Sequence, residues 1–130
     1  MCGINGSLIY KEKPLLENIN SMNNLIIHRG PDDEGVFVET NDKYSVALGM
    51  RRLSIIDLSN GNQPMNSDDE KVVIVFNGEI YNYKILKLKL EAKNITFKTN
   101  SDTEVILKMY LEFGVDSFSQ LDGMFAFSIY

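Results

Sequence analysis

The only cysteine of this chain, Cys2, directly follows the initiator methionine in the segment Met1-Cys2-Gly3-Ile4. If Met1 is removed, the thiol and a free α-amine belong to the same residue. A thiolate is a strong nucleophile, and an α-amine titrates at about 7.7–8.0, close enough to neutrality to accept a proton. Cys2 could therefore supply both nucleophile and base. It could equally be a small apolar residue at a chain end, since lone buried cysteines are common, so the other motifs must decide.

Length and composition describe one globular domain over residues 1–130. The chain is 44% hydrophobic and 24% charged, which suffices for a core and a soluble surface. Its formal net charge of −5 argues against a nucleic-acid partner, because phosphate binding needs a basic surface. A single histidine, His28, leaves no Cys/His cluster for zinc, so we expect no metal site.

The same sequence argues against export and membrane insertion. No apolar run approaches the ~20 residues that span a bilayer, and no signal peptide is evident at the N-terminus. One cysteine cannot form an internal disulfide. We therefore expect a cytoplasmic protein without membrane contact.

Hydrophobic periodicity predicts a mixed α+β layered fold. Helices are expected from Pro14 to Ile26, over 83–92 and after Ser101, where Ser101 and Glu104 have the spacing of a capping box. The segment 83–92 is ambiguous, because Leu86, Leu88 and Leu90 alternate like a strand, but its leucines and lysines favour a helix. Strands or short apolar runs are expected at 3–10, 36–39, 44–48, 54–58, 72–76, 95–98 and 124–130.

Three details of this pattern can be checked against a structure. The run 72–76 is apolar and β-branched throughout, so it should be buried on both faces and should end at Asn77-Gly78. The polar segment 59–71 should be an exposed loop. The strand at 124–130 reaches the last residue without a turn signal, so we expect a domain cut short at its C-terminus.

Four segments of the sequence belong together: Met1-Cys2-Gly3-Ile4, His28-Arg29-Gly30-Pro31-Asp32, Arg52-Leu53-Ser54-Ile55-Ile56-Asp57 and Phe76-Asn77-Gly78-Glu79-Ile80-Tyr81-Asn82. Ser101-Asp102-Thr103-Glu104 follows them. In this order they resemble the glutaminase domain of class II glutamine amidotransferases, which use an N-terminal nucleophile. Within that group the motifs resemble glutamine-hydrolysing asparagine synthetase most, and the resemblance runs along the whole chain.

The resemblance implies a role for each chemical requirement of amide hydrolysis. Cys2 would be the nucleophile, and the Asn77 side chain with the Gly78 N–H would form the oxyanion hole. Free glutamine also has an α-carboxylate, which a guanidinium clamps well. Arg52 matches the family's arginine for that role, with Arg51 as the alternative if the register is off by one. Asp102, assisted by Glu79, would hold the α-ammonium; the backbone of 53–56 could also contact glutamine.

Each assignment has an ordinary structural alternative. Asn77-Gly78 between apolar runs is a strong hairpin signal. Asp102 in the first turn of a helix favours the helix dipole. We interpret His28 as structural, because an α-amine base makes a histidine base unnecessary, and Arg29 and Asp32 as charges that fix their loop.

The resemblance implies an enzyme domain that hydrolyses L-glutamine through a Cys2 thioester to glutamate and ammonia. Its fold would be the four-layer α/β/β/α sandwich with antiparallel sheets, C-terminally truncated. Ammonia would pass to aspartate activated with ATP and Mg in a synthetase domain that this chain lacks. A homodimer is compatible with the resemblance. The alternatives are an amidotransferase with another acceptor and a non-catalytic partner or regulatory module that retains the fold.

Overall fold

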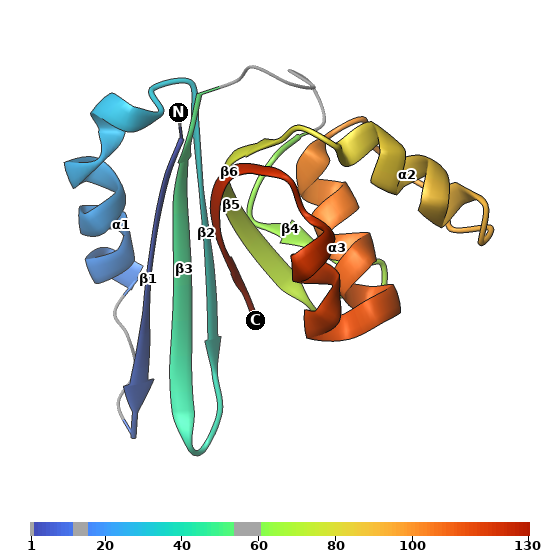
Figure 1. Ribbon diagram of the computed structural model, residues 1–130. Helices are drawn as coiled ribbons and strands as arrows, with labels where there is room; N and C mark the ends of the chain where they lie inside the picture. The colour runs from blue at the N-terminus through green and yellow to red at the C-terminus, as the bar shows by residue number, and fades with distance from the viewer. Residues whose placement is uncertain (1, 12–15, 54–60) are drawn as a thin grey trace.

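Two antiparallel sheets, each of three strands, lie face to face and carry helices on their outer sides (Figure 1). The computed structural model describes residues 2–11, 16–53 and 61–130. In chain order its elements are β1 (Gly3–Tyr10), α1 (Leu16–Leu25), the 3-10 helix η1 (Ile27–Arg29), β2 (Asp33–Thr40), β3 (Tyr44–Arg52), β4 (Met65–Asn66), β5 (Val73–Ile80), α2 (Tyr83–Glu91), α3 (Asp102–Phe113), the 3-10 helix η2 (Gly114–Gln120) and β6 (Gly123–Ile129).

The first sheet has the strand order β1-β3-β2. Its β2–β3 hairpin turns at the predicted Asn41-Asp42, where the Asn41 side chain accepts hydrogen bonds from the N–H groups of Lys43 and Tyr44. Both strands are longer than predicted, because pairing continues to Asp33 opposite Arg52. On the other side of β3, Gly3 of β1 pairs with Arg51.

The second sheet has the order β4-β5-β6. The predicted end of the central strand at Asn77-Gly78 is wrong, because β5 continues to Ile80. Asn77 pairs with Ala126 and Gly78 with Phe125 of β6. Apolar side chains stop at Phe76, but backbone pairing does not depend on them, so the strand outlasts its apolar run.

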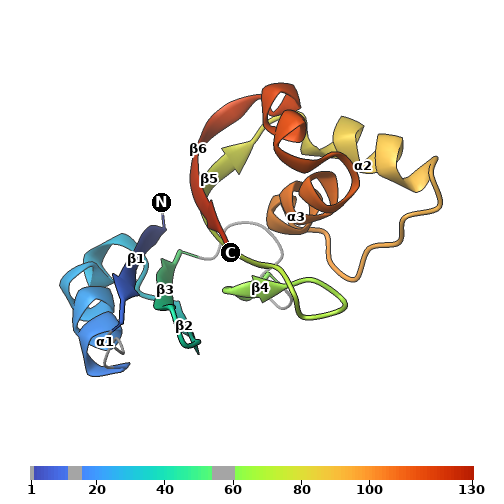
Figure 2. The same ribbon diagram turned by 90° about the horizontal axis from the view of Figure 1, so that it is seen from below.

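The central strand β5 is buried on both faces, as predicted. Val73 and Val75 pack against Leu48 and Met50 of the facing sheet. Ile74 and Phe76 point the other way, into the core beneath α2 and α3. Figure 2 shows the two sheets side by side, with α1 outside one and the other helices outside the second. The predicted α+β fold, a four-layer sandwich with antiparallel sheets, is confirmed.

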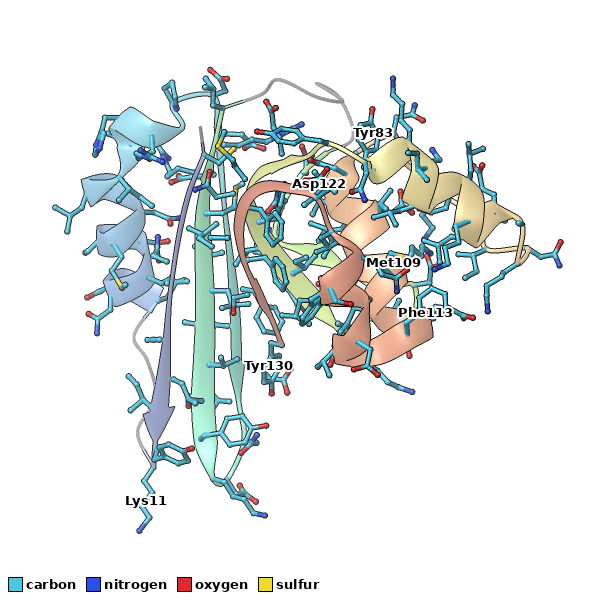
Figure 3. The ribbon with its side chains drawn as sticks, in the orientation of Figure 1. Lys11, Tyr83, Met109, Phe113, Asp122 and Tyr130 are labelled. Carbon is cyan, nitrogen blue, oxygen red and sulfur yellow. The ribbon has the colours of Figure 1, made fainter. Side chains whose placement is uncertain are left out.

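Side chains fill the spaces between these layers (Figure 3). Met109 of α3 is fully buried between the helices and the second sheet, and Tyr130 follows β6 and packs against the inter-sheet core. On the outer side of the first sheet, α1 buries Ile19 and Asn23. Pro14 lies outside the described residues. In the described ranges, no helix is both long and apolar enough to cross a bilayer.

The ambiguous leucine segment is helical, as predicted. α2 buries Leu86 and Leu90 on one face, whereas Leu88 is 65% exposed. A strand would have put all three side chains on one face. The burial of Leu86 and Leu90 but not Leu88 therefore follows the 3.6-residue period of a helix.

Two predictions near α3 meet different outcomes. Ser101 caps the helix, and its hydroxyl accepts a hydrogen bond from the Glu104 N–H at 3.2 Å, as predicted. The predicted strand at 95–98 is wrong. Ile95 and Phe97 instead pack as partly buried side chains against the outer core, and the N–H groups of Lys98 and Thr99 donate to the Glu104 carboxylate. A helix terminus, not a neighbouring strand, binds this backbone.

The predicted loop at 59–71 is only partly a loop. Its described part, 61–71, contains β4 and the buried side chains of Gln63 and Ser67. The polar composition concealed this burial because both side chains are hydrogen-bonded. The predicted apolar run at 54–58 lies outside the described residues.

The two faces of α2 allow a direct test of this packing. We expect Leu90→Ala to lower the free energy of unfolding by about 2–5 kcal/mol, because it leaves a cavity in the outer core. Leu88→Ala on the same helix removes an exposed side chain and should change stability by less than about 0.5 kcal/mol. Urea denaturation of both variants measures the difference; equal losses would contradict the helical packing.

Candidate active site

Strand alternation brings the predicted site residues to one end of the inter-sheet core. On β3, Leu48 and Met50 face the second sheet, and Arg52 continues the same two-residue alternation. Cys2 precedes Gly3, the partner of Arg51, and so lies beside Arg52. On β5, Asn77 follows Val73 and Val75 on the face toward the first sheet. The apolar core thus continues into three polar or reactive side chains.

Cys2 is partly buried and held by contacts on both sides of its chain segment. The Leu53 N–H donates to Sγ at 3.3 Å, and Sγ lies 3.6 Å from the Leu53 carbonyl oxygen. Arg29 Nε donates to the Cys2 carbonyl oxygen at 3.4 Å. These contacts anchor a residue that would otherwise lie at a frayed chain end.

The composition of 28–35, rich in Gly, Pro and Asp, predicts a loop, and its first part contributes to this anchoring. The helix η1 overlaps the start of this segment, and the prediction is wrong for 33–35, where β2 already begins. Between them, the Asp32 N–H donates to the Arg52 carbonyl oxygen at 3.1 Å. Gly30 approaches the backbone of Arg51 so closely that a Cβ would lie 2.4 Å from its carbonyl carbon. His28 is exposed and does not line the cavity described next.

A cavity of about 160 Å³ brings distant parts of the chain together. Its walls include Cys2, Arg52, Gly78, Glu79 and Asp102. A larger groove of about 640 Å³ runs along β1 and β6, but none of the predicted site residues lines it. We therefore take the smaller cavity as the candidate active site.

The two neighbouring arginines have different positions. Arg52 is 5% exposed, lines the cavity, and donates from Nη1 to Asn62 Oδ1 at 3.2 Å. Arg51 points to the opposite face of β3, where its guanidinium forms an ion pair with Glu34 of β2. The structure therefore favours Arg52 over Arg51 as the arginine of this site.

Gly78 presents a backbone N–H toward the cavity. The N–H groups of Val73 and Tyr81 donate to Tyr130 and Asp122 on the β6 side. Because alternate residues of a strand point their N–H groups in opposite directions, those of even-numbered residues point away from β6. The Phe76 N–H donates to Gln63 Oε1 at 2.6 Å, and the Ile80 N–H donates to Asp102 Oδ2 at 3.1 Å. Gly78 lies between them, and no described residue accepts its N–H on that side.

Only glycine fits at position 78. Its φ of 145° is one that other residues rarely adopt, and a Cβ would lie 2.2 Å from the Met124 carbonyl oxygen. The adjacent Asn77 does not line the cavity. Its Oδ1 is buried without a hydrogen-bond partner among the described residues. Asn77 and Gly78 lie within a distorted part of β5, so the hairpin interpretation of these two residues does not apply.

Asp102 is a buried acid at the N-terminus of α3. It is 5% exposed and forms no ion pair with a described cation. Burial raises its pKa above the ordinary 3.8, and the nearby negative charge of Glu79 adds to the effect, although backbone N–H groups including that of Ile80 oppose it. Glu79 itself is exposed at the rim of the cavity. Asp102 and Glu79 therefore make their side of the cavity negatively charged.

Asn62 and Gln63 were not identified from the sequence. Asn62 contacts the guanidinium of Arg52, and the buried Gln63 side chain joins β5 to α3. They lie in a polar segment whose composition is typical of a surface loop. The one sequence signal was Pro64 directly after them, which restricts the backbone but does not reveal burial.

The family profile described as the glutamine amidotransferase domain matches residues 1–130. The chain belongs to this family. It is 48% identical over 136 residues to the glutamine-hydrolysing asparagine synthetase 1 of Bacillus subtilis, covering 100% of this chain and 21% of that relative. It is 39% identical over 129 residues to asparagine synthetase 1 of Arabidopsis thaliana, covering 98% and 21%. The chain therefore spans about a fifth of the length of these curated relatives.

Solved structures agree on the fold. Glutamine phosphoribosylpyrophosphate amidotransferase from Bacillus subtilis superimposes with a TM-score of 0.75 at 24% identity, covering 98% of this chain and 34% of that chain. At this level of identity, the likeness establishes the fold alone.

The raised pKa of Asp102 predicts a cost in stability. Because the folded state resists ionisation of this carboxyl, stability should fall as pH rises through the ordinary value of 3.8 up to the raised pKa, and stay reduced above it. Asp102→Asn removes the charge but can still accept from the Ile80 N–H. We expect this variant to melt at a higher temperature than the wild type at pH 7, with the gain disappearing below pH 3.8. Thermal unfolding across this pH range tests it, and a variant that is less stable at pH 7 would contradict the assignment.

Proposed function

We propose that this domain hydrolyses glutamine through a thioester on Cys2, and that the ammonia is used by a synthetase domain of a longer protein. The observation that carries the proposal is the single cavity shared by Cys2, Arg52, Gly78 and Asp102. Amide hydrolysis of a free amino acid needs a nucleophile, an oxyanion site and two opposite charges for the zwitterion. These four residues come from four distant segments and supply that set.

The charges on the cavity wall fit a zwitterion. A guanidinium can clamp an α-carboxylate with paired hydrogen bonds, and Arg52 presents one from a buried position. Asp102 is a buried carboxylate without a described cationic partner, and an α-ammonium would supply the missing charge. Binding of an amino acid would thus compensate the electrostatic cost of burying Asp102.

The reaction follows from these placements once Met1 is removed. The α-amine of Cys2 takes the thiol proton, and Sγ attacks the side-chain amide carbon, whose C=O π electrons move to oxygen. The Gly78 N–H stabilises this oxyanion, and Asn77 assists if its amide turns toward the cavity. The protonated α-amine then gives its proton to the leaving nitrogen, and ammonia departs. Water cleaves the resulting thioester to glutamate and restores the thiol.

The destination of the ammonia is inferred from the relatives. The relatives from Bacillus subtilis and Arabidopsis thaliana described above are named glutamine-hydrolysing asparagine synthetases. We therefore propose aspartate, activated with ATP and Mg in a further domain, as the acceptor. An amidotransferase with another acceptor would have the same cavity, and a non-catalytic module would retain the fold without the chemistry.

Covalent labelling separates the enzyme from the non-catalytic module. We expect the native protein to lack Met1 and to gain one adduct at Cys2 with a diazo ketone analogue of glutamine, as read by intact mass. Cys2→Ala should abolish labelling and glutamine hydrolysis while leaving the thermal unfolding cooperative. A protein that retains Met1 and does not label would favour the non-catalytic module, and labelling of Cys2→Ala would place the nucleophile elsewhere.

The two arginines provide a matched pair of variants. Arg52→Lys keeps the charge but loses the planar paired donors, so KM for glutamine should rise about 10–100-fold, as expected for a lost charge-assisted hydrogen bond. Arg51→Lys can still pair with Glu34 outside the cavity and should leave KM within about threefold of the wild type. Steady-state glutaminase kinetics measures both. A larger KM effect at Arg51 would reverse the assignment.

A further inference from the structure

Where β4 ends, side chains accept hydrogen bonds from backbone N–H groups on the outer edge of β5. β4 pairs with β5 only through Met65 opposite Ile74 and Asn66 opposite Val73. Continued in the same register, Gln63 would lie opposite Phe76. There the side chain replaces the strand: Gln63 Oε1 accepts the Phe76 N–H at 2.6 Å.

The other end of the Gln63 amide reaches α3. Its Nε2 donates to Thr103 Oγ1 at 3.2 Å, next to Asp102. The residue is 8% exposed and lines the cavity. One buried amide therefore links the strand that carries Gly78 to the helix that carries Asp102, with one hydrogen bond at its oxygen and one at its nitrogen.

Asn62 makes a different contact from the same short segment. Its Oδ1 accepts from Arg52 Nη1, the guanidinium that faces the cavity. Unlike Gln63, Asn62 is exposed. The two consecutive residues thus contact different parts of the proposed site. Asn62 contacts the arginine proposed to bind the α-carboxylate, and Gln63 contacts the strand that carries the proposed oxyanion donor.

The hydrogen bonds along this edge leave one donor available. Gln63 accepts the N–H of Phe76, and Asp102 accepts the N–H of Ile80. The Gly78 N–H between them has no described acceptor. A complete neighbouring strand could have offered a carbonyl to each of these donors. Two side-chain acceptors fix the strand on both sides of Gly78 without using its N–H.

We propose that Gln63 and Asn62 are positioning residues with separate tasks. Gln63 fixes the Gly78 N–H for the transition state, whereas Asn62 fixes the Arg52 guanidinium for binding. The inference rests on the proposed glutaminase function. Its physical basis is that an oxyanion donor is effective only when its position is set in advance.

Two inhibitors separate these tasks in the intact protein. Glutamate binds through its α-groups. Glutamate γ-semialdehyde binds through the same groups and also adds the Cys2 thiol. The S–C bond forms, the C=O π electrons move to the oxygen in the proposed oxyanion hole, and the α-amine of Cys2 takes the thiol proton. Inhibition constants for both ligands do not depend on the fraction of folded enzyme. They therefore distinguish positioning from a general loss of stability.

Gln63→Met keeps the length of the side chain and removes both of its hydrogen bonds. We expect it to weaken the aldehyde by about tenfold or more, with the glutamate constant within about threefold of wild type. Asn62→Ala should weaken both inhibitors by a similar factor, because both carry the α-carboxylate that Arg52 binds. Of these two variants, only Gln63→Met should change the ratio of the two constants.

Thr103 provides a second pair of variants that disturbs less of the core. Thr103→Val removes only the acceptor for Gln63 Nε2 and should shift the aldehyde constant in the same direction, whereas Thr103→Ser keeps the hydroxyl and should restore the wild-type value. Unchanged inhibitor ratios in Gln63→Met and Thr103→Val, with an active wild type, would overturn the positioning role alone. A wild-type protein that neither hydrolyses glutamine nor binds the aldehyde would remove the proposed function itself.

Discussion

The packing of the two sheets against each other determines the positions of Cys2, Arg52 and Asn77 at one end of the inter-sheet core. Met50, Val73 and Val75 are buried almost completely in this interface, and burial of such side chains is the main favourable contribution to folding. Since neighbouring residues of a strand face opposite sides, fixing these residues also fixes their neighbours at steps of two. A shift of one residue in β3 would exchange Arg52 for Arg51 and remove the guanidinium from the cavity. The site is therefore a polar continuation of the core.

The polar groups at the end of this core reduce stability. Asp102 is buried with a raised pKa, and Asn77 Oδ1 has no described partner. Buried polar groups without partners cost free energy, and in native proteins they concentrate at functional sites. The apolar contacts beneath α3, which include the fully buried Ile106 and Met109, offset this cost. The zwitterionic substrate proposed for this site would supply a positive charge for Asp102 and so recover part of this cost.

The sequence allowed much of this to be predicted, because strong periodicity and short motifs both depend on local structure. The strands β1 and β6, the helix α2 and the Ser101 cap were predicted close to their observed positions. Residues 95–98 were not, because their apolar alternation resembles a strand, although their backbone binds Glu104. The paired positions of Cys2 and Arg52 depend on register, which no local pattern contains. Gln63 could not be found at all, since its role depends on a strand edge and a helix far away in sequence.

The edge of β5 illustrates why local patterns fail at such a site. Asn77-Gly78 is favoured in tight turns because glycine tolerates unusual backbone angles, and the same tolerance permits a φ of 145° within a strand. What distinguishes the two outcomes is whether β6 is present to pair with both residues, as it is here. Pairing with β6 fixes one edge of the strand. On the other edge, the side chains of Gln63 and Asp102 accept the N–H groups of Phe76 and Ile80, and no described residue accepts the N–H of the residue between them. A backbone donor can then be held rigidly and still remain available to a ligand, which a regular sheet does not allow in its interior.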